Sequence, residues 1–498
     1  MPTILLYLFV CCIALSLNAC RFLEDTEIAQ DTSLYATIIA NELSGDPSTG
    51  RELPSIESPK AQLGMQLFYS KALGGDMDAA CVTCHHPMLG GGDALSLPIG
   101  TEAEVPDLLG PGRSHAVNGT HYDGGPTVPR NAQSIFNIAL WDDALFHDGR
   151  VESLDKIPGV NGAGAIRTPD SAFNVAVPNA GPNLPAAQAG FPVTSAEEMR
   201  GHQYLAGESN AELRQALVNR LRNVSNSPVD VLPKNDWLQA FRVAFDDPQG
   251  DAQSLINFAN ISEAIAEYER SMVYVDSPWR AYVKGDSHAI SLQAKEGALL
   301  FFGKVENGGA GCNTCHSGDL FSDQQYHNIA MIQIGRGKGD GSNGSDDFGR
   351  YRESGDAKDL YAFRTPSLLN VEVTGPWGHA GAYTSLEAVV RHHVDPMQAI
   401  REFDTTQIDP SISVDDRIIN AQLALAKLNA DIATGRSPVL QTTNLSDEQI
   451  DQLVAFLQTL TDPCVKSRDC LSPWIPDDSL SDPDGLRLNA IDRSGNVL

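Results

Sequence analysis

The segment Cys81-Val82-Thr83-Cys84-His85 has a second copy later in the chain, Cys312-Asn313-Thr314-Cys315-His316. Two thiols three residues apart, followed directly by a histidine, are the pattern by which c-type haem is attached. The thiols can form thioethers with the two vinyl groups of one porphyrin, and the adjacent imidazole then reaches the iron as its proximal ligand. A zinc site would instead need a second pair of ligands for each motif. The two copies therefore predict two covalently bound haem c groups, with His85 and His316 as iron ligands.

The composition is typical of a globular protein, with 42% hydrophobic and 20% charged residues in a chain of 498. This length predicts two or three domains, and the wide separation of the two motifs indicates one haem per domain. The formal net charge of −29 repels phosphate backbones and anionic membrane surfaces, so we expect no nucleic-acid partner. Such a charge favours a basic or neutral partner or a small uncharged substrate, although it also serves solubility alone.

Helical periodicity is the main local pattern. Apolar residues recur at i, i+3 and i+4 in the segments 210–223, 256–272, 385–394 and 445–460. In the last of these, Ser446 is a good N-cap because acidic residues follow it in the first turn. The segments 86–130 and 158–193 are rich in Gly, Pro, Ala and Asn and predict long loops. The fold is therefore predicted to be mostly α, with long irregular loops.

The N-terminus, MPTILLYLFVCCIALSLNAC, has an apolar run from Ile4 to Leu17. That run is short for a membrane span and has the length of a signal-peptide core. Ala19 before Cys20 resembles the lipobox of bacterial lipoproteins, in which the cysteine is acylated, although no Lys or Arg precedes the run. We expect residues 1–19 to be a signal peptide and Cys20 to anchor the mature chain to the outer membrane, in the periplasm or at the cell surface. A plain secretory signal is the alternative.

Cys464 and Cys470 lie beyond the last helical pattern, in TDPCVKSRDCLSPWIP. In an oxidising compartment, two cysteines six residues apart most simply form a disulfide that closes a small loop. A metal site would need more ligands than this segment offers. We therefore predict a disulfide.

Ordered segments around both haem motifs carry a resemblance to a known family. They are GMQLF, CVTCHHPMLGGGD, PRNAQSIFN and FHDGRVESL around the first motif, and ISEAIAEYERSM, GCNTCHSG, FRTPSLLNVEVTGP and HAGAYTSLEAVV around the second. They resemble the bacterial di-haem cytochrome c peroxidase family, which includes MauG and MbnH. The resemblance implies two cytochrome-c-like haem domains, which we place at 55–270 and 271–465, with an N-terminal linker at 20–54 and a C-terminal tail at 466–498.

The resemblance also implies an exported enzyme that reduces hydrogen peroxide at the N-terminal haem, with electrons relayed through the C-terminal haem. In the family, a Glu that precedes a Met beyond the F-x-D-G-R motif moves a proton between the peroxide oxygens. The stretch from Pro192 to Met199 matches and assigns this catalytic role to Glu198; a shift of one residue would select Glu197. Without the resemblance, Glu198 is equally well explained as a charge at a helix N-terminus.

Two positions depart from the family near the first haem. The family has a Trp between the haems, in F-W-D-G-R, and this chain has His147 there. We expect His147 to take the catalytic place of that Trp, because electrons can pass through an imidazole; Trp141, six residues earlier, is a substitute. Ile157 replaces a family Gln, which removes part of the hydrogen bonding around the first haem.

The second haem needs a sixth ligand, which in the family is Met in the peroxidases and Tyr in MauG-like members. Counting from Ser385, that position falls on His393. His392 next door and Met397, four residues further on, are alternatives. Two histidine ligands would stabilise the oxidised iron relative to histidine and methionine.

At the first haem, members that need reductive activation have a removable His ligand in the loop before P-R-N. Here the loop contains His115 and His121, and neither aligns cleanly, so we expect an open or weakly ligated iron. His379 also matches a family position near the second haem, with no role assigned.

The family places a calcium ion between its domains, bound by an Asn side chain and two backbone carbonyls. Asn131, Thr374 and Pro376 match those positions, and oxygen ligands suit a hard cation. As an alternative, Asn131 and Thr374 are ordinary turn residues.

Two sources of electrons compete within the peroxidase hypothesis. One is a small redox protein, and the other is an oxidisable Trp of a partner protein, as in MauG and MbnH. The substituted second-haem ligand and the C-terminal extension favour the second source. A function of a different class is a non-catalytic di-haem electron-transfer cytochrome, in which both irons would be six-coordinate and peroxide would not react.

Overall fold

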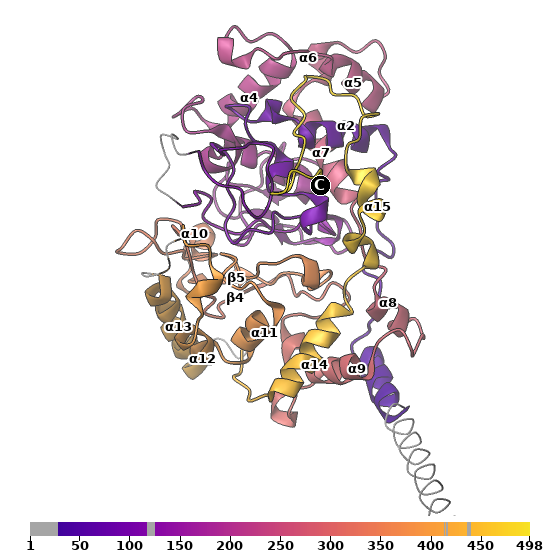
Figure 1. The fold of residues 1–498 in the computed structure, drawn as a ribbon, viewed down its shortest axis with the longest axis vertical. Helices are drawn as coiled ribbons and strands as arrows, with labels where there is room; N and C mark the ends of the chain where they lie inside the picture. The colour runs from indigo at the N-terminus through magenta and orange to yellow at the C-terminus, as the bar shows by residue number, and fades with distance from the viewer. Residues whose placement is uncertain (1–27, 117–124, 413, 415–416, 436–439) are drawn as a thin grey trace, which may run out of the picture.

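The computed structural model describes residues 28–116, 125–412, 414, 417–435 and 440–498. The signal peptide, the lipidation site Cys20 and His121 lie outside these residues. The fold is mainly helical, as predicted, and long irregular segments connect the helices (Figure 1). Within the described residues, no helix is long and apolar enough to cross a membrane.

After a first helix at 28–40, the α-helices are α2 (Pro59–Tyr69), α3 (Leu184–Gln188), α4 (Asn210–Leu221), α5 (Trp237–Ala244), α6 (Ala252–Leu255), α7 (Phe258–Arg270), α8 (Pro278–Val283), α9 (Leu292–Phe302), α10 (Tyr351–Ser354), α11 (Leu386–Val394), α12 (Pro396–Arg401), α13 (Arg417–Ala433), α14 (Asp447–Gln458) and α15 (Arg468–Leu471). Three short strands, β1 (Ala144–Leu145), β2 (Val151–Ser153) and β3 (Ile166–Arg167), form an antiparallel sheet in that order. β4 (Tyr326–His327) pairs with β5 (Phe363–Arg364).

Two separate hydrophobic cores divide the molecule into two lobes. The first lobe is built on α2 and α7, and the second on α9 and α14. Each pair crosses at a glycine, because a Cβ on Gly64 would lie 1.9 Å from the carbonyl oxygen of Ala264, and one on Gly297 would lie 1.9 Å from that of Gln452. In each lobe, the haem motif follows the first helix of its pair. The segment 138–191 packs on the second core, and the predicted domain boundaries stay predictions.

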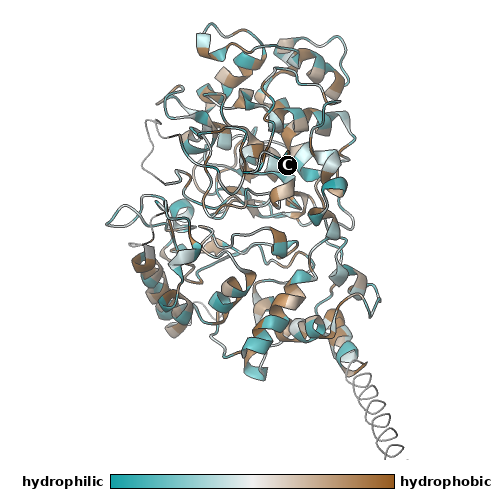
Figure 2. Cartoon of the chain, viewed as in Figure 1, coloured by the Kyte–Doolittle hydropathy of each residue, from teal (hydrophilic) through white to brown (hydrophobic). Residues whose placement is uncertain are grey.

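Helix α14 illustrates how the sequence pattern forms these cores. It begins at Asp447, and its N-cap is Ser446, as predicted, whose side chain accepts a hydrogen bond from the backbone N–H of Gln449. Its buried residues are Ile450, Leu453, Phe456 and Leu457. Figure 2 shows hydrophobic and hydrophilic residues on the same helices, as expected where one face lines a core.

The lobes meet through two equivalent segments. Asn137 and Asn370, in Ser-Ile-Phe-Asn and Ser-Leu-Leu-Asn, both have left-handed backbones and both donate to the Tyr274 carbonyl at 3.0 Å. Six residues before them, the backbone N–H of Asn131 donates to the carbonyl of His379, and that of Arg364 donates to the carbonyl of His147. The segments 131–137 and 364–370 are therefore related by an approximate repeat.

Both ends of the described part of the chain, which begins at residue 28, pack on the lobe that is distant in sequence (Figure 1). In the first helix, Tyr35 stacks on Tyr282 of the second lobe, with ring centroids 5.1 Å apart. In the tail, the carboxylate of Asp484 accepts hydrogen bonds from Ser70 at 2.6 Å and from the indole of Trp237 at 3.1 Å, both in the first lobe. The two ends thus tie the lobes together.

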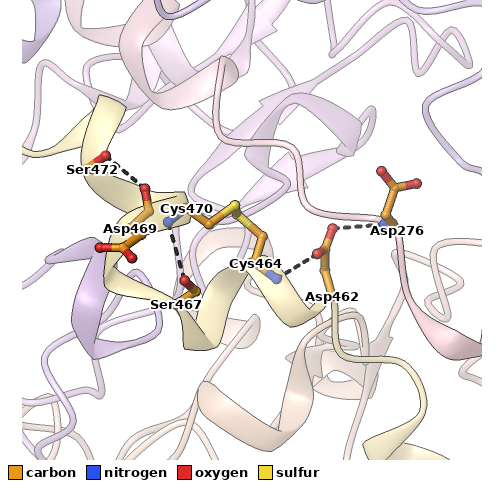
Figure 3. The surroundings of a disulfide bond; sticks show 7 residues. All are labelled: Asp276, Asp462, Cys464, Ser467, Asp469, Cys470 and Ser472. Atoms are coloured by element: carbon orange, nitrogen blue, oxygen red, sulfur yellow. Dashed lines mark hydrogen bonds between the residues drawn. A yellow bond between two sulfur atoms is a disulfide. The ribbon is translucent and has the colours of Figure 1, made fainter.

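A disulfide joins Cys464 and Cys470 where the chain leaves the second lobe for the first (Figure 3). The carboxylate of Asp462 accepts hydrogen bonds from the backbone N–H groups of Cys464 at 2.9 Å and Asp276 at 2.8 Å. The disulfide and these hydrogen bonds together hold the start of the C-terminal tail against the segment at Asp276.

Candidate di-haem active site

One cavity of about 860 Å³ extends through both lobes. Both attachment motifs line it, through Cys81, Cys84, His85, Cys312, Cys315 and His316. None of these four cysteines takes part in a disulfide. Each motif begins with a single 3-10 turn, Cys81–Thr83 and Cys312–Thr314. The two predicted haem sites are therefore parts of one continuous space.

The two motif histidines share one hydrogen-bonding arrangement. Nδ1 of His85 donates to the carbonyl of Gly91 at 3.2 Å, and Nδ1 of His316 donates to that of Phe321 at 3.0 Å. A carbonyl oxygen only accepts, so the proton sits on Nδ1 and Nε2 is left for a metal. Burial lowers the pKa of His85, and burial with nearby His393 lowers the pKa of His316 to about 4. Both imidazoles are thus held in the neutral form that a metal requires.

The cavity also has buried polar atoms suited to the acidic substituents of a porphyrin. Arg364 and His379 line the cavity and are 6% and 5% exposed. Nη1 of Arg364 and both ring nitrogens of His379 have no hydrogen-bond partner among the described residues. Such atoms are costly to bury unless a ligand satisfies them. Together with the thiol pairs and the free Nε2 atoms, they fit two haem c groups.

Glu198 lies on a π-turn, Ala196–Arg200, whose backbone is held in place by contacts with Gly100 and Thr101. Thr101 donates through its backbone N–H to the Glu197 carbonyl at 3.2 Å and through its hydroxyl to the Ala196 carbonyl at 3.1 Å. The backbone approaches so closely that a Cβ on Gly100 would lie 2.3 Å from the Glu198 carbonyl oxygen. This packing fixes the position of the turn beside the cavity.

The two neighbouring carboxylates have different surroundings. Glu197 accepts a hydrogen bond from the Ser195 hydroxyl at 3.1 Å, whereas the Glu198 carboxyl has no hydrogen-bond partner among the described residues. Burial raises the pKa of Glu198, and Arg150 and Lys338 partly offset the rise. Both carboxylates line the cavity. Glu198 is therefore the one whose environment favours carrying a proton.

His147 is half-buried where the lobes meet. Its Nε2 donates to the Asn131 carbonyl at 3.1 Å, and the Gln133 amide lies 3.4 Å from its Nδ1. Burial and the cation of Arg130 lower its pKa to about 3. His147 is thus a neutral imidazole, suited to a place between redox groups rather than to proton transfer. Ile157, the other position that departs from the family, is 49% exposed.

The structure distinguishes the three candidates for the sixth ligand of the second haem iron. The ring centroid of His393 lies 6.2 Å from that of His316, and its Nδ1 donates to the Val389 carbonyl at 2.8 Å. Imidazoles on opposite faces of one metal, with bonds of about 2 Å, place their centroids about 6 Å apart. Both nitrogens of His392 are engaged, with the Tyr383 hydroxyl at 2.8 Å and the Ile329 carbonyl at 3.0 Å. Met397 is 55% exposed, so the geometry favours His393.

We expect His393→Ala to convert the second haem from low-spin to high-spin, because it would remove the proposed sixth ligand. Absorption and electron paramagnetic resonance spectra measure this change. Met397→Ala is the control and should leave the low-spin signal intact. Low-spin character that survives in His393→Ala and disappears in Met397→Ala would identify a histidine–methionine site instead.

The other predicted site residues divide between the cavity and its surroundings. His115 is buried, with Nε2 3.4 Å from the Thr127 hydroxyl, and is not among the described residues that line the cavity. The Asn131 amide donates to the carbonyls of Leu95 and Ser96 at 2.9 and 3.1 Å, which leaves its oxygen for a cation. Thr374 and Pro376 line the same cavity as Asn131.

A cluster of Cys315, Asp323 and His327 has potential metal-ligand atoms within 4.8 Å of one another. His327 pairs with Asp323 at 2.7 Å. The Cys315 thiol is one of those predicted to bind haem, so the cluster belongs to the second haem site.

Glu269, on α7, is a cavity residue that was not predicted from the sequence. It is 4% exposed, lines the cavity, and its Oε2 has no partner among the described residues. Burial raises its pKa to about 8. The helical periodicity of the sequence could have indicated its burial, because Glu269 follows Ile265 by four residues and so falls on the buried face of the helix.

We expect Glu269→Gln to stabilise the protein at pH 7 by about 3 kcal/mol. The unfolded chain releases this proton near pH 4.5, whereas the folded chain keeps it until about pH 8. The folded state therefore binds more protons in this window, and stability falls as pH rises through it. Thermal unfolding at pH 5 and pH 8 measures the loss, which the variant should lack. Glu263→Gln, at a half-buried position of α7 where the carboxylate pairs with Lys60, should retain it. Equal pH dependence in wild type and Glu269→Gln would contradict the assignment.

Two attachment motifs on one cavity, each with a histidine whose Nε2 is free, define a di-haem c-type protein. A family model for di-haem cytochrome c peroxidase matches residues 58–288. The chain is 28% identical over 338 residues to methylamine utilization protein MauG of Methylorubrum extorquens, covering 67% of this chain and 68% of MauG. It is 29% identical over 353 residues to cytochrome-c peroxidase IdrP1 of Pseudomonas sp. strain SCT, covering 66% and 70%.

Among solved structures, the fold is similar to that of a MauG-like protein associated with microbial copper homeostasis. The TM-score is 0.53 at 22% identity, covering 87% of this chain and 97% of that one. The chain is therefore similar to the di-haem cytochrome c peroxidases and MauG, in agreement with the resemblance that its motifs carry. It is an oxidoreductase of the peroxidase class.

Proposed function

We propose that the protein reduces hydrogen peroxide in the first lobe with electrons that pass through the second lobe. The observation that carries this proposal is the single cavity shared by both attachment motifs, with Glu198 on its wall. A haem iron bound at His85 would supply the open coordination position at which peroxide is reduced. The reaction consumes two electrons and two protons for each peroxide and yields two water molecules.

The residues of the chain contribute proton transfer and positioning. Glu198 takes the proton from the near peroxide oxygen and returns it to the far one as the O–O bond breaks. Its raised pKa supports this role, because a carboxyl that accepts and releases a proton works best with a pKa near the operating pH. The clamp formed by Gly100 and Thr101 limits the movement of the turn during this transfer.

The test is to mix oxidised protein with one equivalent of peroxide while recording the absorption spectrum and the residual peroxide. We expect an immediate spectral change and stoichiometric loss of peroxide. An unchanged spectrum with peroxide remaining would support the non-catalytic electron carrier instead.

For the source of electrons, we propose a Trp side chain of a partner protein rather than a small redox protein. The 6.2 Å separation of His316 and His393 supports this, because two nitrogen ligands favour the oxidised iron and so ease storage of an oxidising equivalent. The net charge of −29 favours a partner with a basic or neutral surface. The competing source is tested by adding a reduced small cytochrome and measuring its oxidation by peroxide.

The proposal also includes calcium and export. The free oxygen of Asn131 and the backbone oxygens of Thr374 and Pro376 suit a hard cation between the lobes. The N-terminal pattern that ends in Cys20 supports export and a lipid anchor.

A further inference from the structure

Arg364 is a buried cation that has no ion-pair partner among the described residues. Its Nε donates to the Phe146 carbonyl at 3.1 Å, and its Nη1 is unpaired. Nearby Arg130, also buried, is paired with Asp148 at 2.5 Å and with Asp347 at 2.7 Å. Burial lowers the pKa of Arg364 to about 10, so it remains charged at neutral pH.

The guanidinium of Arg364 lies over the ring of Trp141. The guanidinium carbon is 3.6 Å from the indole centroid. Trp141 is 6% exposed and lines the cavity that contains both attachment motifs. An easily oxidised side chain therefore sits beside the groups that would handle the oxidising power of peroxide.

The stacked cation changes how easily this indole is oxidised. A neutral indole attracts a guanidinium through the negative face of its ring. Loss of one electron gives the indole a positive charge, and the guanidinium at contact distance then repels it. A porphyrin carboxylate bound at Nη1 would offset only part of this repulsion, because the face of the guanidinium stays against the indole. Because the pair is buried, water screens the repulsion weakly.

We propose that Arg364 is a positioning residue that keeps Trp141 reduced, so that oxidising equivalents cross the cavity without being consumed by this indole. The proposal rests on the proposed peroxidase function. Under this proposal, Trp141 does not substitute for the family Trp whose position His147 occupies. The neutral imidazole of His147 is then the side chain left for electron transfer between the lobes.

The reaction that Arg364 suppresses is hydroxylation of the indole. In that reaction the O–O bond of hydrogen peroxide breaks, one oxygen replaces a ring C–H of Trp141 by C–OH, and the other leaves as water. The indole loses two electrons and peroxide gains them.

The test compares Arg364→Gln and Arg364→Met with wild type in the haem-loaded protein. The Met variant keeps a long side chain over the indole, so a folding defect in Arg364→Gln does not decide the outcome. Each sample receives equimolar peroxide, and mass spectrometry of the digested protein measures added oxygen at Trp141. We expect about ten-fold or more oxidation in both uncharged variants. Trp141→Phe in the Arg364→Gln background should abolish the signal.

Two controls separate charge from general disturbance. Arg364→Lys retains a cation and should stay close to wild type. Arg336→Gln removes another cavity-lining arginine, which donates to the Pro126 carbonyl at 2.9 Å, and should also leave Trp141 unmodified. Wild-type levels of Trp141 oxidation in both uncharged variants would overturn the proposal.

A second arm distinguishes this proposal from the peroxidase function. The same proteins are exposed to a photogenerated one-electron oxidant, ruthenium tris(bipyridine) with persulfate. Peroxide that remains unconsumed in wild type contradicts the peroxidase function alone. The ranking of variants with the ruthenium oxidant then still decides the role of Arg364, because that arm needs no peroxide chemistry.

Discussion

The double variant Cys81→Ser/Cys84→Ser is expected to hold about half as much haem per chain as wild type and to lose peroxide turnover. Serine hydroxyls do not form thioethers with the porphyrin vinyl groups, so the first site cannot retain its haem covalently. The site beside Glu198 would then lack the metal at which peroxide is reduced. A pyridine haemochrome assay measures haem, and residual peroxide measures turnover.

Two matched variants test this result. Cys312→Ser/Cys315→Ser should remove the other half of the haem. Cys464→Ser/Cys470→Ser also removes two cysteines, but these form the disulfide, so both haems should remain. A wild-type protein with about one haem per chain would contradict the two-haem assignment.

Glu198→Gln is expected to slow peroxide reduction by ~10²–10⁴-fold while both haems remain bound. Glutamine preserves the shape of the side chain but cannot take a proton from one peroxide oxygen and deliver it to the other. Steady-state peroxide consumption measures the loss, and the haem assay shows that the cofactors are retained.

Glu197→Gln is the control for this prediction, because it changes the neighbouring carboxylate on the same turn. Its hydrogen bond with Ser195 indicates a role in holding the turn, so a smaller effect is expected. A large loss in Glu197→Gln with little change in Glu198→Gln would transfer the catalytic role to Glu197.

Features that depend on neighbouring residues could be predicted from the sequence. The attachment motifs need thiols and an imidazole within five positions, and the disulfide closes a loop between cysteines six positions apart. The N-cap at Ser446 likewise depends only on the next turn of helix. Mainly helical structure and the resemblance to di-haem peroxidases follow from many such short patterns taken together.

Choices among adjacent candidates needed the tertiary structure. The family register selects His393 and leaves His392 as an alternative, and the helix turns His392 toward Tyr383 and Ile329 and His393 toward His316. Likewise, the structure leaves the Glu198 carboxyl at the cavity without a described partner, whereas Glu197 bonds to the nearby Ser195.

The sequence by itself determined the helical class and the disulfide pair and predicted the haem attachment chemistry, because each rests on covalent reach or local periodicity. The tertiary structure decided which distant residues come together. Examples are the stack of Arg364 on Trp141, the burial of Glu269, and the packing of each described end of the chain on the distant lobe. These features join residues far apart in the chain. Their pairing depends on how two cores and an approximate repeat fit together, which no single stretch of sequence encodes.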